Sequence, residues 1–309
     1  MKKALFTALF CFSLLHIYGQ INMNDSTVQV VGYWDKNEKQ SYLISHEKIQ
    51  LKETDTISRE IYTYNVDITI ADSTENSYTI NWFYHDYKID SDNEIMKMLN
   101  SITEDMTISI KTDGLGVFQE VINWEEIRDY ISKGLALLKV ELKDKMKDIP
   151  NFDKIIGQTE TLFSTKEAIE NSAINEIMQF YYFHGLLYKL GEEYNYSSPI
   201  ANIYGGEPLN TDITLWLDDI DADNNSYIMR TYQMVDSKQL TKVSYDYICQ
   251  LAETLGGTAP AWDKMPPLSN ETRSASSIHG SGWILYSVQT KEVTAENQTT
   301  IEETIIELQ

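Results

Sequence analysis

The sequence predicts an α+β fold, in which a strongly curved, half-barrel-like antiparallel sheet has about three amphipathic helices packed on one face. Three observations lead to this prediction. Several segments alternate strictly between apolar and polar residues, and three others repeat apolar residues at helical spacing. Strand-like segments stand both before and after the helical ones, as expected for helices grouped on one side of an antiparallel sheet.

The clearest strand pair lies between residues 61 and 84. Its first strand has one apolar face, made by Tyr62, Tyr64, Val66, Ile68 and Ile70. After the turn-like segment 71–77, the second strand repeats the pattern with Tyr78, Ile80, Trp82 and Tyr84. The apolar positions then shift by one residue to Tyr87 and Ile89, which predicts a β-bulge near His85 and Asp86.

Further strands are predicted on both sides of this hairpin. Two weaker candidates precede it at 27–34 and 39–51, and 106–110 and 117–122 follow it. The second half of the chain holds further strand-like segments at 213–217, 227–235, 271–279, 283–293 and 299–308. The last three are separated only by short turns, which predicts a closing meander.

Three helices are predicted between these strands. The first begins at a capping box of Asn123 and Glu126 and ends before Pro150. The second begins at Ser164 and Glu167 and carries a stripe that ends near Gly191: Ile169, Ala173, Ile177, Phe180, His184 and Leu187. The third runs from about Ser237 to Leu255 and ends at a pair of glycines, 256–257.

The N-terminus has the pattern of a secretory signal peptide. Lys2 and Lys3 precede an apolar run over 4–15, which is shorter than the roughly 20 residues that span a membrane. Cleavage near Gly19 would export the rest of the chain to the periplasm or beyond the cell. No later segment is apolar enough for a membrane helix.

Removal of residues 1–19 leaves a strongly acidic chain with one cysteine. The formal charge changes from 25 − 47 = −22 to 23 − 47 = −24, which argues against nucleic-acid partners. Cys249 would then have no partner for an intrachain disulfide, so the fold depends on its core. We expect one domain over 20–309, with a weak internal boundary near 191–211.

Several segments resemble a broad group of uncharacterised exported bacterial proteins that carry domains of unknown function. The shared features are the hairpin 57–89, the segment 110–118 that leads to Asn123-Trp124-Glu125-Glu126, and the closing strands from Gly282 to Thr304. The arrangement also resembles, at the level of fold, the half-barrel of the periplasmic lipoprotein-localisation-factor superfamily. That resemblance implies helices over the concave face and, in many members, an enclosed acyl chain.

No segment predicts a cofactor, and the metal-binding candidates are weak. Asp219, Asp221 and Asp223 have the spacing of the first ligands of a calcium loop. Asn224 and Arg230 occupy the positions where such a loop needs glycine and a bidentate glutamate. A polar hairpin turn is therefore the preferred interpretation, with a calcium site as the alternative.

The aromatic face of the first hairpin is the candidate ligand-binding surface. We name Tyr62, Tyr64, Trp82 and Tyr84 on the sheet and His184 on the second helix as candidate ligand-binding residues. An ordinary packed core is the preferred interpretation of both the tyrosine-rich face and His184, with ligand binding as the alternative. No catalytic residue is identified.

Three functions remain open. The leading hypothesis is a non-enzymatic exported protein that binds an apolar or amphiphilic ligand in the curved sheet. The second is a structural or interaction module of the cell envelope, with a protein partner and no small ligand. The third is a hydrolase of glycans or peptides, based only on the many carboxylates and aromatic residues. The sequence does not decide the oligomeric state.

Overall fold

The computed structural model describes residues 20–90, 105–142, 157, 160–161, 163–202 and 206–309. The expected signal segment 1–19 and the end of the first predicted helix lie outside them. The longer strands are β3 (Lys39–Lys52), β4 (Asp55–Thr74), β5 (Ser77–Asp90), β6 (Met106–Asp113), β9 (Glu193–Ile200), β10 (Leu209–Asp221), β11 (Ser226–Val235), β12 (Leu268–His279), β13 (Ile284–Ala295) and β14 (Gln298–Leu308). The short strands are β1 (Ile21–Asn22), β2 (Thr27–Gln29), β7 (Phe118–Val121) and β8 (Leu187–Lys189). The helices are α2 (Trp124–Leu142), α4 (Lys166–Ser172), α5 (Asn175–Tyr181), α6 (Ser237–Thr254) and the short 3₁₀ helix η1 (Trp262–Lys264).

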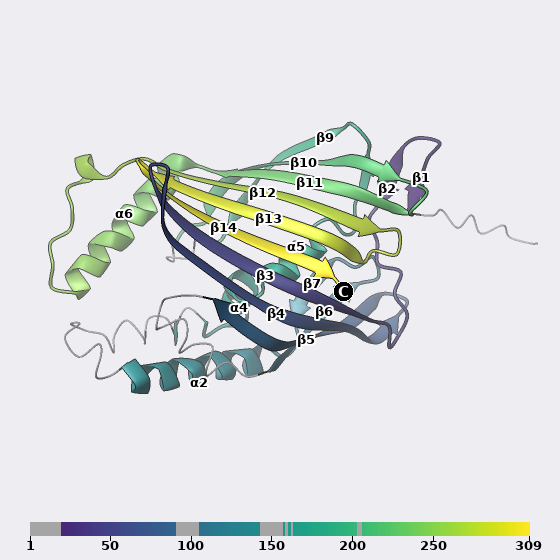
Figure 1. Cartoon of the computed structure of the whole chain (residues 1–309), viewed down its shortest axis with the longest axis horizontal. Coiled ribbons are helices and arrows are strands. Elements are labelled where there is room, and N and C mark those ends of the chain that lie inside the picture. The colour runs from purple at the N-terminus through teal and green to yellow at the C-terminus, as the bar shows by residue number, and fades with distance from the viewer. Residues whose placement is uncertain (1–19, 91–104, 143–156, 158–159, 162, 203–205) are drawn as a thin grey trace, which may run out of the picture.

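One large antiparallel sheet dominates the molecule. Its eleven strands follow the order β7-β6-β5-β4-β3-β14-β13-β12-β11-β10-β9. The sheet is curved and does not close, and α4 and α5 lie behind it in the view of Figure 1, on its concave side. The last strand, β14, pairs with β3 and so joins the two halves of the chain in one sheet. The predicted α+β class and curved antiparallel sheet are confirmed.

The first hairpin forms as its alternation predicts. Val66, Ile68 and Ile70 on β4 are buried, and they pair across the strands with Tyr84, Trp82 and Ile80 on β5. The intervening residues of β4 point to the opposite, convex face, because successive side chains of a strand alternate.

The predicted bulge is present in β5. Thr63 pairs with Lys88 but Asn65 pairs with His85, so β5 has one extra residue between these pairs. Asp86 in this bulge has φ of 57°, in the left-handed region. The extra residue turns Tyr87 toward the concave face, where its ring lies 5.3 Å from that of Tyr64.

The predicted helix count of three is wrong, because the described residues contain four α-helices. The second predicted helix is divided into α4 and α5 by a break at Ala173 and Ile174, and it ends at Tyr181, so His184 lies in a loop and Leu187 in β8. In one continuous helix, Ile174 would lie roughly 140° around the axis from Ile169. The break allows both isoleucines to be fully buried in the core. The helix cap is also shifted by one residue, since Thr165 rather than Ser164 accepts the hydrogen bond from the Ala168 N–H.

The other two helices begin near the predicted residues, and side-chain hydrogen bonds hold the start of each. At the start of α2, Asn123 donates from Nδ2 to the Glu126 carboxylate and accepts from the Ser109 N–H at 2.8 Å, so it ties the helix to β6. The third predicted helix is confirmed as α6, with Asp236 as its N-cap and Gly256 at φ of 70° beyond its end. Cys249 lies on α6 as a free, half-buried thiol.

The main core lies between the concave face and α5. Phe180 and Tyr181 of α5 pack on Trp82, with ring centroids 5.2 and 6.1 Å away. Trp82 and Phe180 are fully buried. A smaller core forms where α6 covers the sheet, and it contains Leu209, Val235 and Leu240.

The segment proposed as a weak boundary, 191–211, contains β9 and the start of β10. These strands pair with each other from Leu209–Ile200 to Trp216–Glu193. A second, three-stranded sheet of β1, β2 and β8 lies at one end of the large sheet. Among the described residues, no helix is both long enough and apolar enough to cross a membrane.

Candidate functional site

The candidate site is a polar belt on the concave face, formed by two neighbouring rows of residues that cross four central strands. The first row consists of Tyr62, His46, Thr304 and Gln289, and the second of Glu60, Lys48, Glu302 and Lys291. Each residue stands opposite its neighbour in the pairing of β4, β3, β14 and β13. All eight are half-buried, and none is aliphatic. We call these eight residues the polar belt.

The belt borders the packed core directly. The next row toward the other end of the same strands contains Tyr64, Ile44 and Ile306, which are all buried. The concave face therefore changes within one row from a closed apolar core to a half-exposed polar surface.

A chain of hydrogen bonds connects the belt to α5. Thr304 Oγ1 lies 2.9 Å from His46 Nδ1, and His46 Nε2 lies 2.8 Å from the Tyr64 hydroxyl. Tyr64 donates to Glu176 Oε1 on α5 at 3.1 Å. Because Tyr64 uses its proton for Glu176, His46 must donate from Nε2, and its Nδ1 accepts from Thr304. The chain thus selects one tautomer and orientation of His46.

Burial favours the uncharged forms of His46, Tyr62 and Tyr64. It lowers the pKa of His46, although the nearby Glu176 and Glu302 carboxylates act in the opposite direction. Burial also raises the pKa of Tyr62 to about 12, and the same two carboxylates add to this effect. The pKa of Tyr64 is raised well above its usual value, mainly by burial. A lowered pKa makes His46 a weak base, so its contact with the Thr304 hydroxyl positions the two side chains rather than activating a nucleophile.

The second row contains an ion pair. Lys48 Nζ lies 2.9 Å from Glu302 Oε1. Burial opposes ionisation of Glu302, but the bond to Lys48 and the charge of Lys291 outweigh it and lower its pKa. The belt therefore holds its ions in an alternating arrangement across the strands.

Amide and hydroxyl groups extend the polar surface beyond the belt. Gln289 Nε2 donates to Ser274 Oγ on β12 at 3.2 Å. Deeper on the same face, Gln179 of α5 donates to Ser287 Oγ at 2.9 Å, and Ser287 contacts Ser276 at 2.8 Å. These bonds fix α5 over β12 and β13.

The five residues named from the sequence lie in one continuous aromatic cluster. Tyr62 and Tyr64 have ring centroids 6.5 Å apart, Tyr64 and Tyr84 5.6 Å, and Tyr84 and Trp82 6.4 Å. Only Tyr62 is half-exposed and belongs to the polar belt, because Tyr64, Trp82 and Tyr84 are covered by α5.

His184 lies at the far end of this cluster, in the loop after α5. Its ring is 5.5 Å from that of Tyr181, and its Nε2 contacts the Gly282 carbonyl at 3.0 Å. Burial lowers the pKa of His184 to about 4. A Cβ on Gly116, which has φ of +90°, would come within 2.9 Å of the His184 ring. His184 therefore packs a tight loop junction and does not face the belt.

The three aspartates of the possible calcium loop lie at the β10–β11 turn. Asp221 accepts hydrogen bonds from the backbone N–H and the side-chain amide of Asn224, at 3.0 and 2.7 Å. Asp219 and Asp223 flank it on the end of β10 and in the turn. In the part of the chain that the structure describes, no three His, Cys, Asp or Glu side chains are grouped to hold a metal ion.

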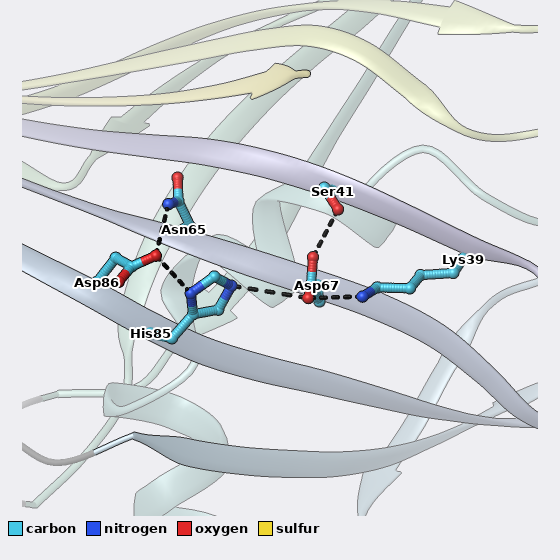
Figure 2. A network of polar contacts seen from close by, with 6 residues as sticks. All are labelled: Lys39, Ser41, Asn65, Asp67, His85 and Asp86. Carbon is cyan, nitrogen blue, oxygen red and sulfur yellow. Dashed lines mark hydrogen bonds and ion pairs between the residues drawn. The ribbon is translucent and has the colours of Figure 1, made fainter.

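A second polar network lies on the convex face of β3, β4 and β5 (Figure 2). Asp67 accepts a hydrogen bond from Ser41 at 2.5 Å and forms an ion pair with Lys39 at 2.7 Å. His85 lies between two carboxylates, 3.7 Å from Asp67 and 2.8 Å from Asp86. Asp86 also accepts from Asn65 at 3.2 Å.

This convex network supports the site on the other face. Its contacts with His85 and Asn65 hold Asp86 in the left-handed conformation of the bulge. The bulge in turn directs Tyr87 and Ile89 toward the concave side, beside Tyr62 and Tyr64. Its role is therefore to place the aromatic wall of the candidate site.

Most of the belt was missed by reasoning from the sequence. His46 and Lys48 share one face of the weak strand candidate 39–51, and Glu302 and Thr304 share one face of the last strand. The alternation places each pair on a face, but it does not bring β14 beside β3. Only the pairing of these two strands reveals the belt.

No protein-family model matches the chain, and no curated protein sequence matches it either.

Proposed function

We propose that the chain is an exported, non-enzymatic binding protein that holds an amphiphilic ligand against the concave face of a half-barrel-like sheet. One observation supports this proposal above all others. A half-exposed polar belt and a half-exposed apolar strip lie side by side on the same face, so this face can accommodate both parts of an amphiphile.

The apolar strip consists of Tyr87, Ile89 and Ile131, which are all half-buried. Ile89 stands directly opposite Tyr62, the belt residue at the edge of β4. Tyr87 and Ile131 pack against the main core, and the hydroxyl of Tyr130 on α2 is close enough to help raise the pKa of Tyr87. An apolar chain along this strip would place its polar end on the belt.

The test is to identify what the protein carries. The mature chain is purified without detergent from its native host and analysed by native mass spectrometry, followed by solvent extraction. We expect a bound amphiphile that the Ile89→Asp variant no longer retains. Tyr286→Asp is the control, because Tyr286 is 41% exposed and stands on the convex face of β13. A protein that is empty in both forms would contradict the proposal.

A second function has support from a different surface. Met23, Leu186 and Leu187 are 56–58% exposed on the small sheet and the segments beside it. Exposed apolar residues can contribute to protein interaction sites. This observation favours an envelope interaction module as the alternative.

The alternative makes a separate prediction. Leu187→Asp should weaken a stable complex seen by chemical cross-linking in envelope fractions, whereas Val140→Asp on α2, at a position 70% exposed, should leave it unchanged. Loss of the complex in both variants would contradict a role of the small sheet.

A further inference from the structure

The charges of the polar belt cancel. Glu60 and Glu302 carry two negative charges, and Lys48 and Lys291 carry two positive ones. Lys48 is engaged with Glu302 at 2.9 Å, and Lys291 stands directly opposite Glu302 on β13. Recognition of a phosphate, sulfate or carboxylate relies on cationic donors that the anion can recruit. Lys48 is instead committed to Glu302, and Lys291 lies close enough to Glu302 for its charge to lower the pKa of that carboxyl.

The uncharged groups of the belt offer both donors and acceptors. Thr304 and Gln289 stand side by side on β14 and β13, and Ser274 and Thr272 continue the two rows on β12. Thr304 donates its proton to His46, so it can only accept from a ligand hydroxyl, whereas Gln289 keeps a second amide N–H and its carbonyl oxygen and can do both.

Two buried polar atoms lie on the same face beyond the belt: one belongs to Asn270 on β12, and the other to Thr211 on β10, opposite Val235 of the smaller core. Thr211 Oγ1 and Asn270 Oδ1 have no hydrogen-bond partner among the described residues, and Thr211 is only 1% exposed. Asn270 stands opposite Val293, one row beyond Lys291. Buried polar groups without partners are rare in proteins, and they mark positions where a polar ligand or water can bind.

An aromatic platform stands at the edge of the belt. The half-exposed ring of Tyr62 is stacked on His46, with ring centroids 4.5 Å apart and an angle of 21° between the planes. Flat rings beside hydroxyl and amide groups suit a pyranose, because its C–H groups pack on the ring while its hydroxyls form hydrogen bonds.

We propose that the polar belt binds a neutral, hydroxyl-rich group, such as one or two glycosyl units. This inference rests on the proposed function and specifies the polar part of its ligand. The glycosyl group could belong to a glycolipid or to a free oligosaccharide, and the experiment below distinguishes these sources.

The experiment compares ligands with the same twelve-carbon chain and different heads. Isothermal titration calorimetry is carried out with dodecyl maltoside, dodecylphosphocholine and laurate, each below its critical micelle concentration, and with maltotriose. We expect dodecyl maltoside to bind at least about tenfold more tightly than the other two amphiphiles, since a few additional hydrogen bonds produce a factor of this size.

Matched variants test whether the polar belt causes the preference for dodecyl maltoside. Thr304→Val and Gln289→Leu should each lower the affinity for dodecyl maltoside by about tenfold and leave the affinity for laurate unchanged. Thr290→Val is the control, because the Thr290 hydroxyl contacts Glu303 on the opposite face of the same strands. Far-ultraviolet circular dichroism confirms that each variant is folded before titration.

The possible outcomes separate the inference from the proposed function. Equal binding of all three amphiphiles, unchanged in Thr304→Val, would overturn the glycosyl inference and leave the proposed function intact. Absence of binding by all four ligands would overturn both. Maltotriose binding as tight as that of dodecyl maltoside would support the glycosyl inference and contradict the need for an apolar tail.

Discussion

The two halves of the concave face are built on the same strands, but one half is a packed core and the other is a half-exposed polar surface. On β3, Tyr42 and Ile44 are fully buried, whereas His46 and Lys48, the next two residues on that face, are half-exposed. The difference arises because α5 covers one half, where Phe180 packs on Tyr42 with ring centroids 5.6 Å apart. A single short helix therefore separates a structural core from a half-exposed polar surface.

The contrast between the two halves also predicts how each responds to amino-acid substitution. Substitutions in the packed half should lower the free energy of unfolding strongly, because cavities in a dense core are costly. Substitutions in the belt should affect stability little and ligand retention strongly. The following predictions test this contrast, from the largest expected effect to the smallest.

Trp82→Ala should have the largest effect on stability. Trp82 is fully buried against Phe180 and Tyr181, so its removal leaves a cavity that should cost about 3–5 kcal/mol. Urea denaturation monitored by circular dichroism measures this loss. Trp262→Ala is the matched control, because Trp262 is 50% exposed and its removal should cost far less. Similar losses in the two variants would contradict a packed core at Trp82.

Low pH should weaken the packed half through His184. Burial lowers the pKa of His184 to about 4 in the folded chain, below its ordinary value of 6.5. Between these values only the unfolded chain binds the proton. The contribution of His184 is therefore complete above pH 6.5 and is lost as the pH falls toward 4, to a total of about 3 kcal/mol.

Urea titrations of the wild type and His184→Gln at about pH 7.5 and about pH 4.5 isolate this effect, since the carboxylates titrate in both proteins. We expect stability to fall more in the wild type than in the variant. An identical fall in the two proteins would show that His184 is accessible to protons in the folded state.

Tyr64→Phe tests the boundary between the two halves. The substitution removes the hydroxyl that donates to Glu176 and accepts from His46, and it leaves both groups without this partner. We expect a loss of about 1–3 kcal/mol in the free energy of unfolding. Tyr62→Phe removes the equivalent hydroxyl from a half-exposed ring and should lower the free energy of unfolding by less than about 0.5 kcal/mol. Equal costs would contradict the hydrogen-bond chain.

The bulge at Asp86 provides a smaller test. Because Asp86 has φ of 57°, glycine should be tolerated there and a β-branched residue should be strained. We expect Asp86→Val to melt about 2–4 °C below Asp86→Gly. Differential scanning calorimetry measures this difference, and a valine variant as stable as the glycine variant would contradict the bulge geometry.

The ion pair of the belt should matter least for stability. The side chains of Lys48 and Glu302 are 42% and 44% exposed, so water and salt screen their attraction. We expect Lys48→Met to change the free energy of unfolding by about 0.5 kcal/mol or less. A loss of several kcal/mol in urea denaturation would show that the belt is a closed part of the core.

Local patterns predicted most of the fold because each depends on neighbouring residues. The alternation over 61–84 gave the hairpin and its buried face, and the change of parity after Tyr84 located the bulge at Asp86. The division of the second helix at Ile174 was missed, because burial of that side chain in the finished core overrides a continuous helical stripe.

The candidate site was much less predictable. Tyr62 was named from its position on an aromatic face, but the sequence could not separate it from Tyr64, which has the same pattern and is buried. Thr304 and His46 are far apart in the chain, and only the register of β14 against β3 places their side chains 2.9 Å apart.

The sequence by itself determined which residues share a face of a strand or a helix, because side-chain direction follows from the backbone repeat of each element. It therefore specified an α+β chain with a curved antiparallel sheet and a strongly aromatic face. Only the tertiary structure decided which part of that face is closed by α5 and which part stays half-exposed as the polar belt. Burial depends on contacts between segments distant in the chain, and no local pattern carries that information.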